Sequence, residues 1–292
     1  MGNVSVNGVD LHYWTVGEGP DIVMLHGLGG NLAIWHMHVV PLLRDKFRLT
    51  TFDMRGHGRS GMPQSGYTTR HIAEDVRGLM DALGIEKAHL AGHSMGADVS
   101  LHFAMCYPER ADRLVLVEAG LPALVAARKD ESWVGWSYWA EMIETYTGEP
   151  VPPESRTDYR YLLHQSLKVP IMFGPSAGKS RRRQHKFEAL LDTTTLVEDY
   201  EVVGELTLEN IATVPHPKLL MYEQGSPYLG TFYEICDYAT NYETVLLPPT
   251  RLRHFFPLEK PEILAAHIDD FCNPDRAVVN GRALEPLLSY DK

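Results

Sequence analysis

Short apolar runs separated by helical repeats form the main pattern along the chain. Residues 3–6 and 9–14 alternate apolar and polar positions on either side of Asn7-Gly8, which predicts a β-hairpin closed by a two-residue turn. The continuous apolar run at residues 21–25 predicts a buried central strand. Further strands are predicted at residues 47–52, 86–91, 114–117, 218–222 and 242–247.

Helical periodicity fills the intervals between these runs. In residues 69–83 the apolar side chains recur at helical spacing, and Gly84 follows at the C-terminal end. Residues 34–43, 98–107 and 261–271 are predicted to be helical as well. Strands that alternate with helices in this way predict an α/β fold with a mostly parallel central sheet wound by right-handed crossovers.

The alternation stops between residues 121 and 210. This segment predicts several helices instead, at about 131–146, 157–167 and 181–193. We therefore expect a helical lid at 121–210. The lid is inserted into a core formed by residues 1–120 and 211–272, and a C-terminal tail at 273–292 follows the core.

Composition limits the kinds of function. A chain of 292 residues with 44% hydrophobic content is long enough for one large core with an insertion. Its formal net charge of -11 argues against binding to nucleic acid, which requires a basic surface. Three widely spaced cysteines, a first segment without a signal-peptide pattern and the lack of a long apolar run predict a cytoplasmic protein that does not insert into membranes.

The segment Gly92-His93-Ser94-Met95-Gly96 joins a predicted buried strand directly to a predicted helix. A serine in this context lies on a tight, strained turn, and the two glycines remove side chains that would clash there. Ser94 is therefore the candidate nucleophile. It also lies at the positive N-terminal end of a helix, which favours negative charge beside it.

Two further loops follow predicted strands. His26-Gly27-Leu28-Gly29-Gly30 follows the run at 21–25, and its glycines allow the backbone to approach a ligand with the Leu28 amide free. His254 follows the last predicted strand of the core. Neither a metal-ligand cluster nor a dinucleotide-binding loop is apparent in the sequence, so no cofactor is expected.

Four stretches, taken in their order and at their intervals, resemble the α/β-hydrolase superfamily. They are His26-Gly27-Leu28-Gly29-Gly30, Asp53-Met54-Arg55-Gly56-His57-Gly58-Arg59-Ser60, Gly92-His93-Ser94-Met95-Gly96 and Arg253-His254-Phe255-Phe256-Pro257-Leu258-Glu259-Lys260-Pro261. The resemblance covers about residues 4–272 and much less of the lid. It implies the α/β-hydrolase fold, with Ser94 as nucleophile, His254 as general base and the backbone amides of Leu28 and Met95 as the oxyanion hole.

The acid that would complete a catalytic triad with Ser94 and His254 departs from the family pattern. Most relatives have an aspartate after the strand equivalent to 219–222, but Ser226 stands there in this chain. Glu118, at the end of the preceding strand, resembles the acid of pancreatic-type lipases and of curacin-type thioesterases that release polyketide chains. Glu223 is the alternative acid. Asp98, one turn into the helix after Ser94, is expected to face away from the site.

Several aromatic side chains are candidates for the wall of an apolar substrate pocket: Trp35, Trp133, Trp136, Tyr138 and Trp139. Packing within the lid is the alternative role for them. The segment from Gly174 to Ser180 resembles a phosphate-binding loop but is one residue too short, and it is expected to be a lid loop.

A basic stripe interrupts the acidic sequence of the lid and consists of Lys179, Arg181, Arg182, Arg183, His185 and Lys186. It is either a solvated helix face or a docking site for an acidic partner, such as an acyl carrier protein or the phosphates of a coenzyme A thioester.

These observations predict a serine hydrolase that cleaves a carboxylic ester or an acyl-thioester through an acyl-serine intermediate. Two alternatives stay open: a carbon–carbon bond hydrolase with the same serine site, and a non-catalytic pseudohydrolase that binds a small molecule. Haloalkane dehalogenases and epoxide hydrolases are excluded as models, because both need a carboxylate where Ser94 stands.

Overall fold

The computed structural model describes residues 1–122, 124, 132–169 and 181–285, with the backbone alone for residues 181–184. Within this part of the chain, the strands form one sheet in the order β1-β2-β4-β3-β5-β6-β7-β8-β9. The strands are β1 (Gly2–Val6), β2 (Val9–Val16), β3 (Asp21–Leu25), β4 (Arg48–Phe52), β5 (Ala88–His93), β6 (Ala111–Val117), β7 (Lys218–Glu223), β8 (Tyr242–Leu247) and β9 (Arg282–Leu284).

The sheet is antiparallel only at its N-terminal edge. β1 pairs with β2 and β2 with β4 in antiparallel register, whereas every pair from β4 to β9 is parallel. Asn7 and Gly8 close the β1–β2 hairpin with φ angles of 49° and 74°, the conformation that a two-residue turn of this kind requires. The expected hairpin and the expected mostly parallel α/β sheet are both confirmed.

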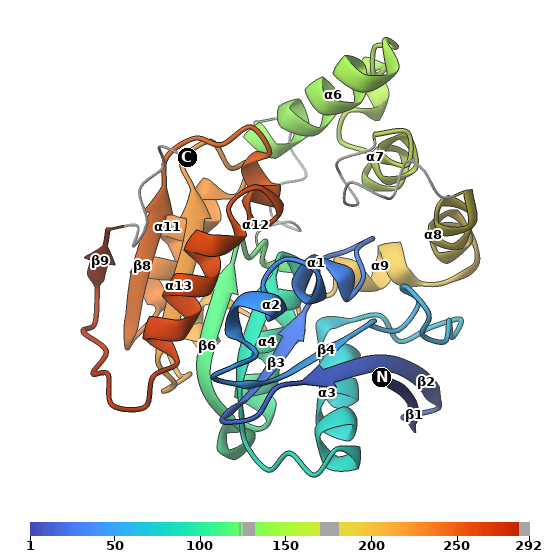
Figure 1. Cartoon of the computed structure of the whole chain (residues 1–292). Coiled ribbons are helices and arrows are strands. Elements are labelled where there is room, and N and C mark those ends of the chain that lie inside the picture. Colours follow the sequence, from blue (N-terminus) through green and yellow to red (C-terminus); the bar gives the residue numbers. More distant parts are fainter. Residues whose placement is uncertain (123, 125–131, 170–180, 286–292) are drawn as a thin grey trace.

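Helices cover the two faces of the sheet (Figure 1). On one face, α1 (Ala33–His36), α2 (Val40–Leu43), α12 (Phe256–Glu259) and α13 (Pro261–Phe271) bury their apolar side chains against the strands. On the other face lie α3 (Thr69–Ala82), α4 (Met95–Cys106) and α11 (Leu229–Tyr238). The parallel strands are therefore buried from both sides, which explains their continuous apolar runs.

The helices of the inserted segment gather beyond the carboxyl ends of the central strands (Figure 1). They are α6 (Val134–Thr147), α7 (Tyr159–Ser166), α8 (Arg181–Thr193) and α9 (Leu196–Tyr200). The short helix α10 (Leu208–Ile211) follows them in the chain and packs against α11. In open α/β sheets ligands bind at the carboxyl ends of the strands. The inserted helices therefore lie over the edge of the sheet where a substrate would bind.

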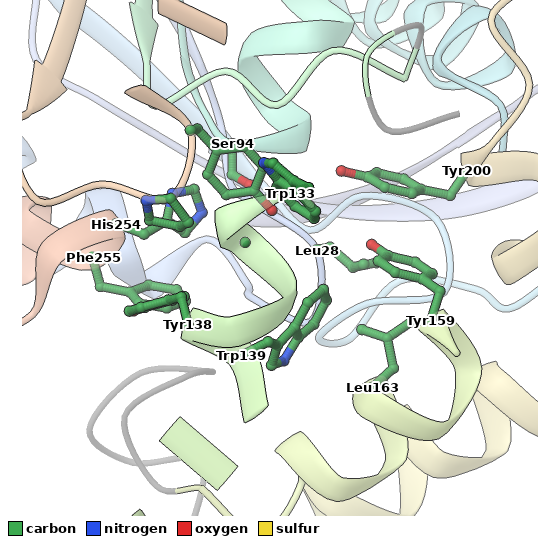
Figure 2. A pocket seen from close by; sticks show the side chains of 13 residues that line it. Leu28, Ser94, Trp133, Tyr138, Trp139, Tyr159, Leu163, Tyr200, His254 and Phe255 are labelled. Carbon is green, nitrogen blue, oxygen red and sulfur yellow. The ribbon is translucent and has the colours of Figure 1, made fainter. Parts of the chain in front are cut away.

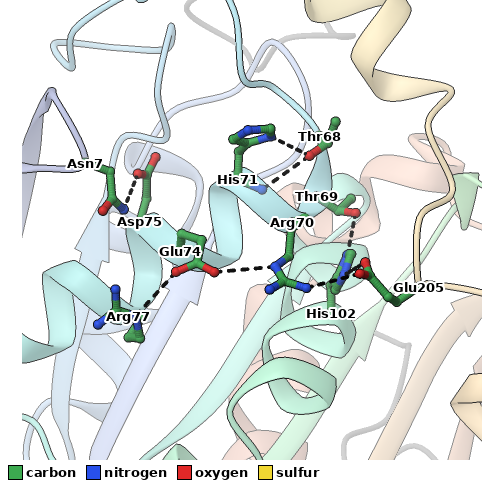
Figure 3. A network of polar contacts seen from close by, with 10 residues as sticks. All are labelled: Asn7, Thr68, Thr69, Arg70, His71, Glu74, Asp75, Arg77, His102 and Glu205. Atoms are coloured by element: carbon green, nitrogen blue, oxygen red, sulfur yellow. Dashed lines mark hydrogen bonds and ion pairs between the residues drawn. The ribbon is translucent and has the colours of Figure 1, made fainter.

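Polar contacts tie the end of the inserted segment to the core helices (Figure 3). Glu205 accepts a hydrogen bond from Arg70 of α3 at 3.2 Å and lies 3.2 Å from the Nε2 atom of His102 on α4. The Nδ1 atom of His102 is in turn 2.8 Å from the hydroxyl of Thr69. The base of the insertion is thus fixed to α3 and α4, the helices that flank the nucleophile.

Several element boundaries differ from the sequence predictions. Residues 34–43 form two short helices, because Pro41 lacks a backbone N–H and begins a new helix instead of continuing the first one. The helix predicted at 98–107 begins at Met95, directly after the turn at Ser94. Helices α9, α10 and α11 and the edge strand β9, which lies within the predicted tail, were not predicted.

Candidate active site

Ser94 lies in the sharp turn between β5 and α4 and has a strained backbone, with φ 55° and ψ -125°. Its amide donates a hydrogen bond of 2.8 Å to the carbonyl of Val117 on the neighbouring strand. A Cβ atom on Gly92 would lie 2.2 Å from the Gly96 oxygen, and one on Gly96 would lie 2.4 Å from the Leu25 oxygen. Only glycine fits at these two positions, as the sequence predicts for a nucleophile turn.

Glu118 and His254 meet in a buried pair. Oε2 of Glu118 lies 3.2 Å from Nδ1 of His254, and the Glu118 side chain is fully buried. Oε1 of Glu118 accepts a hydrogen bond of 2.8 Å from the Glu223 amide. The Ser226 hydroxyl donates to Oε2, the same oxygen that faces His254. The structure therefore brings the candidate acid Glu118 to the histidine.

Glu223, the alternative acid, is engaged elsewhere. Its Oε1 atom accepts hydrogen bonds from the amides of Gly225 at 3.0 Å and of Thr250 at 2.8 Å. Within the described residues, no hydrogen bond joins Glu223 to His254. Glu223 instead holds two loops in place beside the Glu118–His254 pair.

Burial opposes charge on both members of the pair. It raises the pKa of the Glu118 carboxyl, while hydrogen bonds from the Ser226 hydroxyl and the Glu223 amide act in the opposite direction. Burial also lowers the pKa of His254, so the resting imidazole is neutral. With Nδ1–H directed to Glu118, the Nε2 atom of His254 is the ring position left to accept a proton.

The loop carrying Leu28 packs directly against the serine turn. A Cβ atom on Gly27 would lie 3.0 Å from Cβ of Ser94, so this glycine permits the close approach. The Gly29 amide donates to Nε2 of His57 at 3.1 Å. Among the described residues, no acceptor is found for the amides of Leu28 and Met95, the two expected oxyanion donors.

Three buried histidines brace this site. Nε2 of His26 accepts from the Met54 amide at 3.0 Å, and Nε2 of His93 lies 2.9 Å from the carbonyl of His254. Burial lowers the pKa of His26 to about 4 and those of His57 and His93 to about 3. Neutral rings with fixed hydrogen-bonding roles are therefore expected to hold the oxyanion loop and the backbone of His254.

A cavity opens beside Ser94 and His254 (Figure 2), and its empty space of about 550 Å³ includes the part that is open to solvent. Most of its wall is aromatic. Three predicted wall residues line it, namely Trp133, Tyr138 and Trp139. Leu28 and Phe255, which belong to the stretches quoted above, also line it. No motif marks the other lining residues, which are Gly135, Tyr159, Leu163, Tyr200, Pro227 and Tyr228.

Trp35 and Trp136 were predicted to line the cavity, but they do not. Trp35 is buried in the core on the face of the sheet covered by α2 and α13, where its Nε1–H donates to the carbonyl of Leu25 at 2.9 Å. Trp136 packs edge-on against Trp133, with ring centroids 5.0 Å apart and planes at 85°, and lies behind the cavity wall. Spacing alone could not distinguish these buried positions from lining ones.

Asp98, which was expected to face away from the site, does not line the cavity and instead holds nearby backbone. It is fully buried, and its Oδ1 atom accepts hydrogen bonds from the amides of Gly120 at 3.1 Å and of Leu121 at 3.0 Å. Burial raises the pKa of Asp98 to about 7. Asp98 therefore fixes the backbone that follows Glu118, whose own φ is 54°.

The predicted basic stripe lies mostly outside the described part of the chain. Lys179 and the side chains of Arg181, Arg182 and Arg183 are not described, and neither is the loop from Gly174 to Ser180. Lys186 is described, and its ammonium donates to the carbonyls of Gly58 at 3.0 Å and Ser60 at 2.6 Å. Lys186 thus joins α8 to the loop after β4.

No helix in the described ranges combines the length and the hydropathy needed to span a bilayer. In the same ranges, no group of three or more histidine, cysteine or acidic side chains is arranged to hold a metal ion.

Comparison with known proteins agrees with this architecture. Residues 20–147 match the family model described as the alpha/beta hydrolase fold. The soluble epoxide hydrolase of Corynebacterium sp. (strain C12) is 35% identical over 122 residues, which are 42% of each chain. The chain spans well under half the length of the curated relatives it matches.

Solved structures match nearly the whole chain at low identity. Est816, titled as an N-acyl homoserine lactone degrading enzyme, superposes with a TM-score of 0.67 at 20% identity and covers 92% of this chain and 100% of its own. The meta-cleavage product hydrolase CumD from Pseudomonas fluorescens IP01 gives a TM-score of 0.69 at 22% identity, with 94% and 98% coverage. At these identities the likeness shows the fold.

Proposed function

We propose that this chain is a serine hydrolase of the α/β-hydrolase superfamily that cleaves a carboxylic ester or an acyl-thioester, and the family-model match over residues 20–147 supports this class. The observation that carries the proposal is the contact of Glu118 with Nδ1 of His254, beside a cavity that Ser94 also lines. It supplies the acid that the usual position, occupied by Ser226, does not.

The proposed reaction begins with attack of the Ser94 hydroxyl oxygen on the substrate carbonyl carbon. His254 accepts the hydroxyl proton at Nε2 and then gives it to the leaving alcohol or thiol as the bond to the carbonyl carbon breaks. Water attacks the resulting acyl-serine, again with His254 as base, and releases the acid. Glu118 keeps the Nδ1–H tautomer and stabilises the imidazolium formed in each half-reaction.

The amides of Leu28 and Met95 are proposed to bind the oxygen that becomes negative during each attack. Their lack of an acceptor among the described residues supports this role. Loss of one such donor typically lowers turnover by about 10²–10³-fold. The strained turn at Ser94 and the close packing of Gly27 hold the two donors in place without reorganisation during the reaction.

The cavity favours an apolar or aromatic acyl group, because Trp133, Tyr138 and Trp139 line it beside Leu163 and Phe255. A small-molecule acyl substrate is therefore proposed. Delivery of that acyl group by an acyl carrier protein or coenzyme A is a further proposal, carried by the basic residues in the sequence of the lid. Epoxide opening, the activity named for one relative, would need a carboxylate where Ser94 stands.

The experiment that tests the function is hydrolysis of matched oxygen esters and thioesters of acetate, hexanoate and phenylacetate. We expect turnover by the wild type and loss of at least about 10³-fold in Ser94→Ala. The exposed lid serine in Ser137→Ala provides a matched control and should leave the rates unchanged. The ratio of thioester to ester rates then shows whether the enzyme prefers a thiol or an alcohol as the leaving group.

Absence of turnover on the whole panel would contradict the proposal. In that case, hydrolysis of a dienoic diketo acid would indicate carbon–carbon bond cleavage by the same serine site. Tight binding of a small molecule without turnover of any substrate would indicate a pseudohydrolase.

A further inference from the structure

One side of the otherwise apolar cavity carries a pair of phenol hydroxyls. Tyr159 on α7 and Tyr200 on α9 stack with ring centroids 5.3 Å apart and planes only 3° from parallel. Both side chains line the cavity. Figure 2 shows both hydroxyls directed toward the side of the cavity where Ser94 and Trp133 lie.

The surroundings of this pair are hydrophobic and rigid. Tyr159 and Tyr200 are only 8% and 4% exposed, and Trp139 packs edge-on against Tyr159 at a centroid distance of 5.3 Å. Burial raises the pKa of Tyr159 well above its ordinary value, so this phenol stays protonated and keeps a hydrogen to donate. A phenol hydroxyl has one donor hydrogen and two acceptor lone pairs, so it can bind either a hydroxyl or a carbonyl group of a ligand.

A buried carboxyl group lies behind the pair. The Oδ2 atom of Asp98 is buried and has no hydrogen-bond partner among the described residues. Oδ2 of Asp98 and the Tyr200 hydroxyl lie 3.7 Å and 3.5 Å from the place where a Gly120 side chain would begin. Buried polar atoms are nearly always paired, so the unpaired Oδ2 of Asp98 in the neighbourhood of the Tyr200 hydroxyl indicates a site completed by a ligand or by water.

We propose that Tyr159 and Tyr200, with Asp98 behind them, form a polar subsite for an oxygen substituent on the substrate. The substituent is a hydroxyl or carbonyl group on an otherwise apolar or aromatic skeleton. The proposal rests on the proposed hydrolase function and narrows its substrate class to oxygenated esters or thioesters. Ser94 and His254 act on the acyl bond, while the tyrosine pair forms hydrogen bonds with a second oxygen in the same molecule.

The expected selectivity follows from the energetics of buried hydrogen bonds. A substrate that lacks the oxygen makes one hydrogen bond fewer with the subsite, and water can take its place there. The loss of such a buried hydrogen bond corresponds to a decrease of about tenfold or more in kcat/KM. A phenylalanine at either position removes the hydroxyl but keeps the ring stack. The variant should therefore lose the preference for the oxygenated substrate over its parent, while the aromatic wall of the cavity remains.

The test uses ethyl 3-phenylpropanoate and its ortho, meta and para ring-hydroxylated counterparts, in which the added hydroxyl is remote from the reacting carbonyl. A second series places the hydroxyl on the alcohol, as in 2-phenylethyl acetate and its ring-hydroxylated forms. We expect at least one hydroxylated member to exceed its parent about tenfold in kcat/KM with the wild type. The series that shows the preference identifies the acyl or the alcohol side as the one bound.

Tyr159→Phe and Tyr200→Phe should each reduce that ratio to about one to threefold. Tyr161→Phe, the same substitution on the same helix but outside the cavity lining, should retain it. A ratio near one in the wild type, or a ratio that both variants retain, would overturn the proposal. The pair would then be a packing feature hydrated by water.

A binding measurement separates this proposal from the proposed function. Calorimetry with Ser94→Ala compares 3-phenylpropanoate with its ring-hydroxylated acids and needs no turnover. If the hydroxylated acids bind more tightly and Tyr159→Phe removes the difference, the subsite stands even when no ester is hydrolysed. Equal binding of all the acids, together with equal binding of 2-phenylethanol and its ring-hydroxylated forms, would overturn the subsite and leave the hydrolase proposal intact.

Discussion

At the scale of single residues, the most unusual feature is the position of the candidate acid Glu118, which follows a different strand from the one that the resemblance implies. Glu118 occupies the end of β6, and Ser226 stands on the loop after β7 where relatives most often place the acid. The Ser226 hydroxyl and Nδ1 of His254 contact the same carboxylate oxygen. The two positions therefore converge on one point in space, and an acid is needed at only one of them.

Glu118→Gln should lower kcat/KM by about 10³–10⁴-fold, because an amide cannot stabilise the imidazolium of His254 by charge. The matched change Glu223→Gln keeps an acceptor for the amides of Gly225 and Thr250 and should stay within about threefold of the wild type. Steady-state kinetics on the best ester measures both. Equal losses in the two variants would contradict the assignment of Glu118.

The double variant Glu118→Gln/Ser226→Asp restores a carboxylate from the usual strand. Since the Ser226 side chain already reaches the oxygen that faces His254, we expect kcat/KM to recover at least about tenfold over Glu118→Gln alone. The same kinetics with Glu118→Gln/Ser226→Asn as control separates charge from shape. Failure of the aspartate to exceed the asparagine would show that the two positions are not interchangeable.

At the scale of elements, the sequence was most informative where local chemistry decides the structure. The turn at Asn7-Gly8, the apolar runs of β3 to β8 and the glycines around Ser94 are local signals, and the structure agrees with them. α9 and α10 are short and owe their stability to tertiary packing. Helices this short show no periodic pattern in the sequence, so they were not predicted.

The same distinction applies to the site. Ser94, Leu28 and Met95 lie in loops whose residue types dictate their backbone, so sequence reasoning could single them out. Tyr159 and Tyr200 face the cavity because the fold of the insertion brings α7 and α9 close enough for the two rings to stack in nearly parallel planes. That arrangement joins residues distant in sequence, and composition could not reveal it.

For the whole molecule, buried ionisable groups link stability to pH. Burial lowers the folded-state pKa of several histidines below the ordinary value, and the unfolded chain takes up these protons first as the pH falls below about 6.5. The group comprises His26, His57, His93, His254 and His267. Burial raises the pKa of Asp98 and Glu118, which has the opposite effect, but these carboxyls are fewer.

We therefore predict that the free energy of unfolding decreases from pH 7 to pH 5, with each buried histidine contributing on the order of 1–2 kcal/mol. The loss should continue until the pH reaches the folded-state values of about 3 to 4 for His26, His57 and His93. Urea unfolding followed by tryptophan fluorescence at several pH values measures it. A midpoint that is constant or higher at pH 5 would contradict this account.

The central claim is that Ser94 is an activated nucleophile. The most direct measurement is the intact mass of the protein after treatment with a fluorophosphonate, which phosphonylates an activated serine oxygen and releases fluoride. We predict one label per chain, mapped to the peptide containing Ser94, together with strongly slowed labelling in Glu118→Gln and none in Ser94→Ala. A wild-type protein that stays unlabelled, or a label that persists in Ser94→Ala, would contradict the claim.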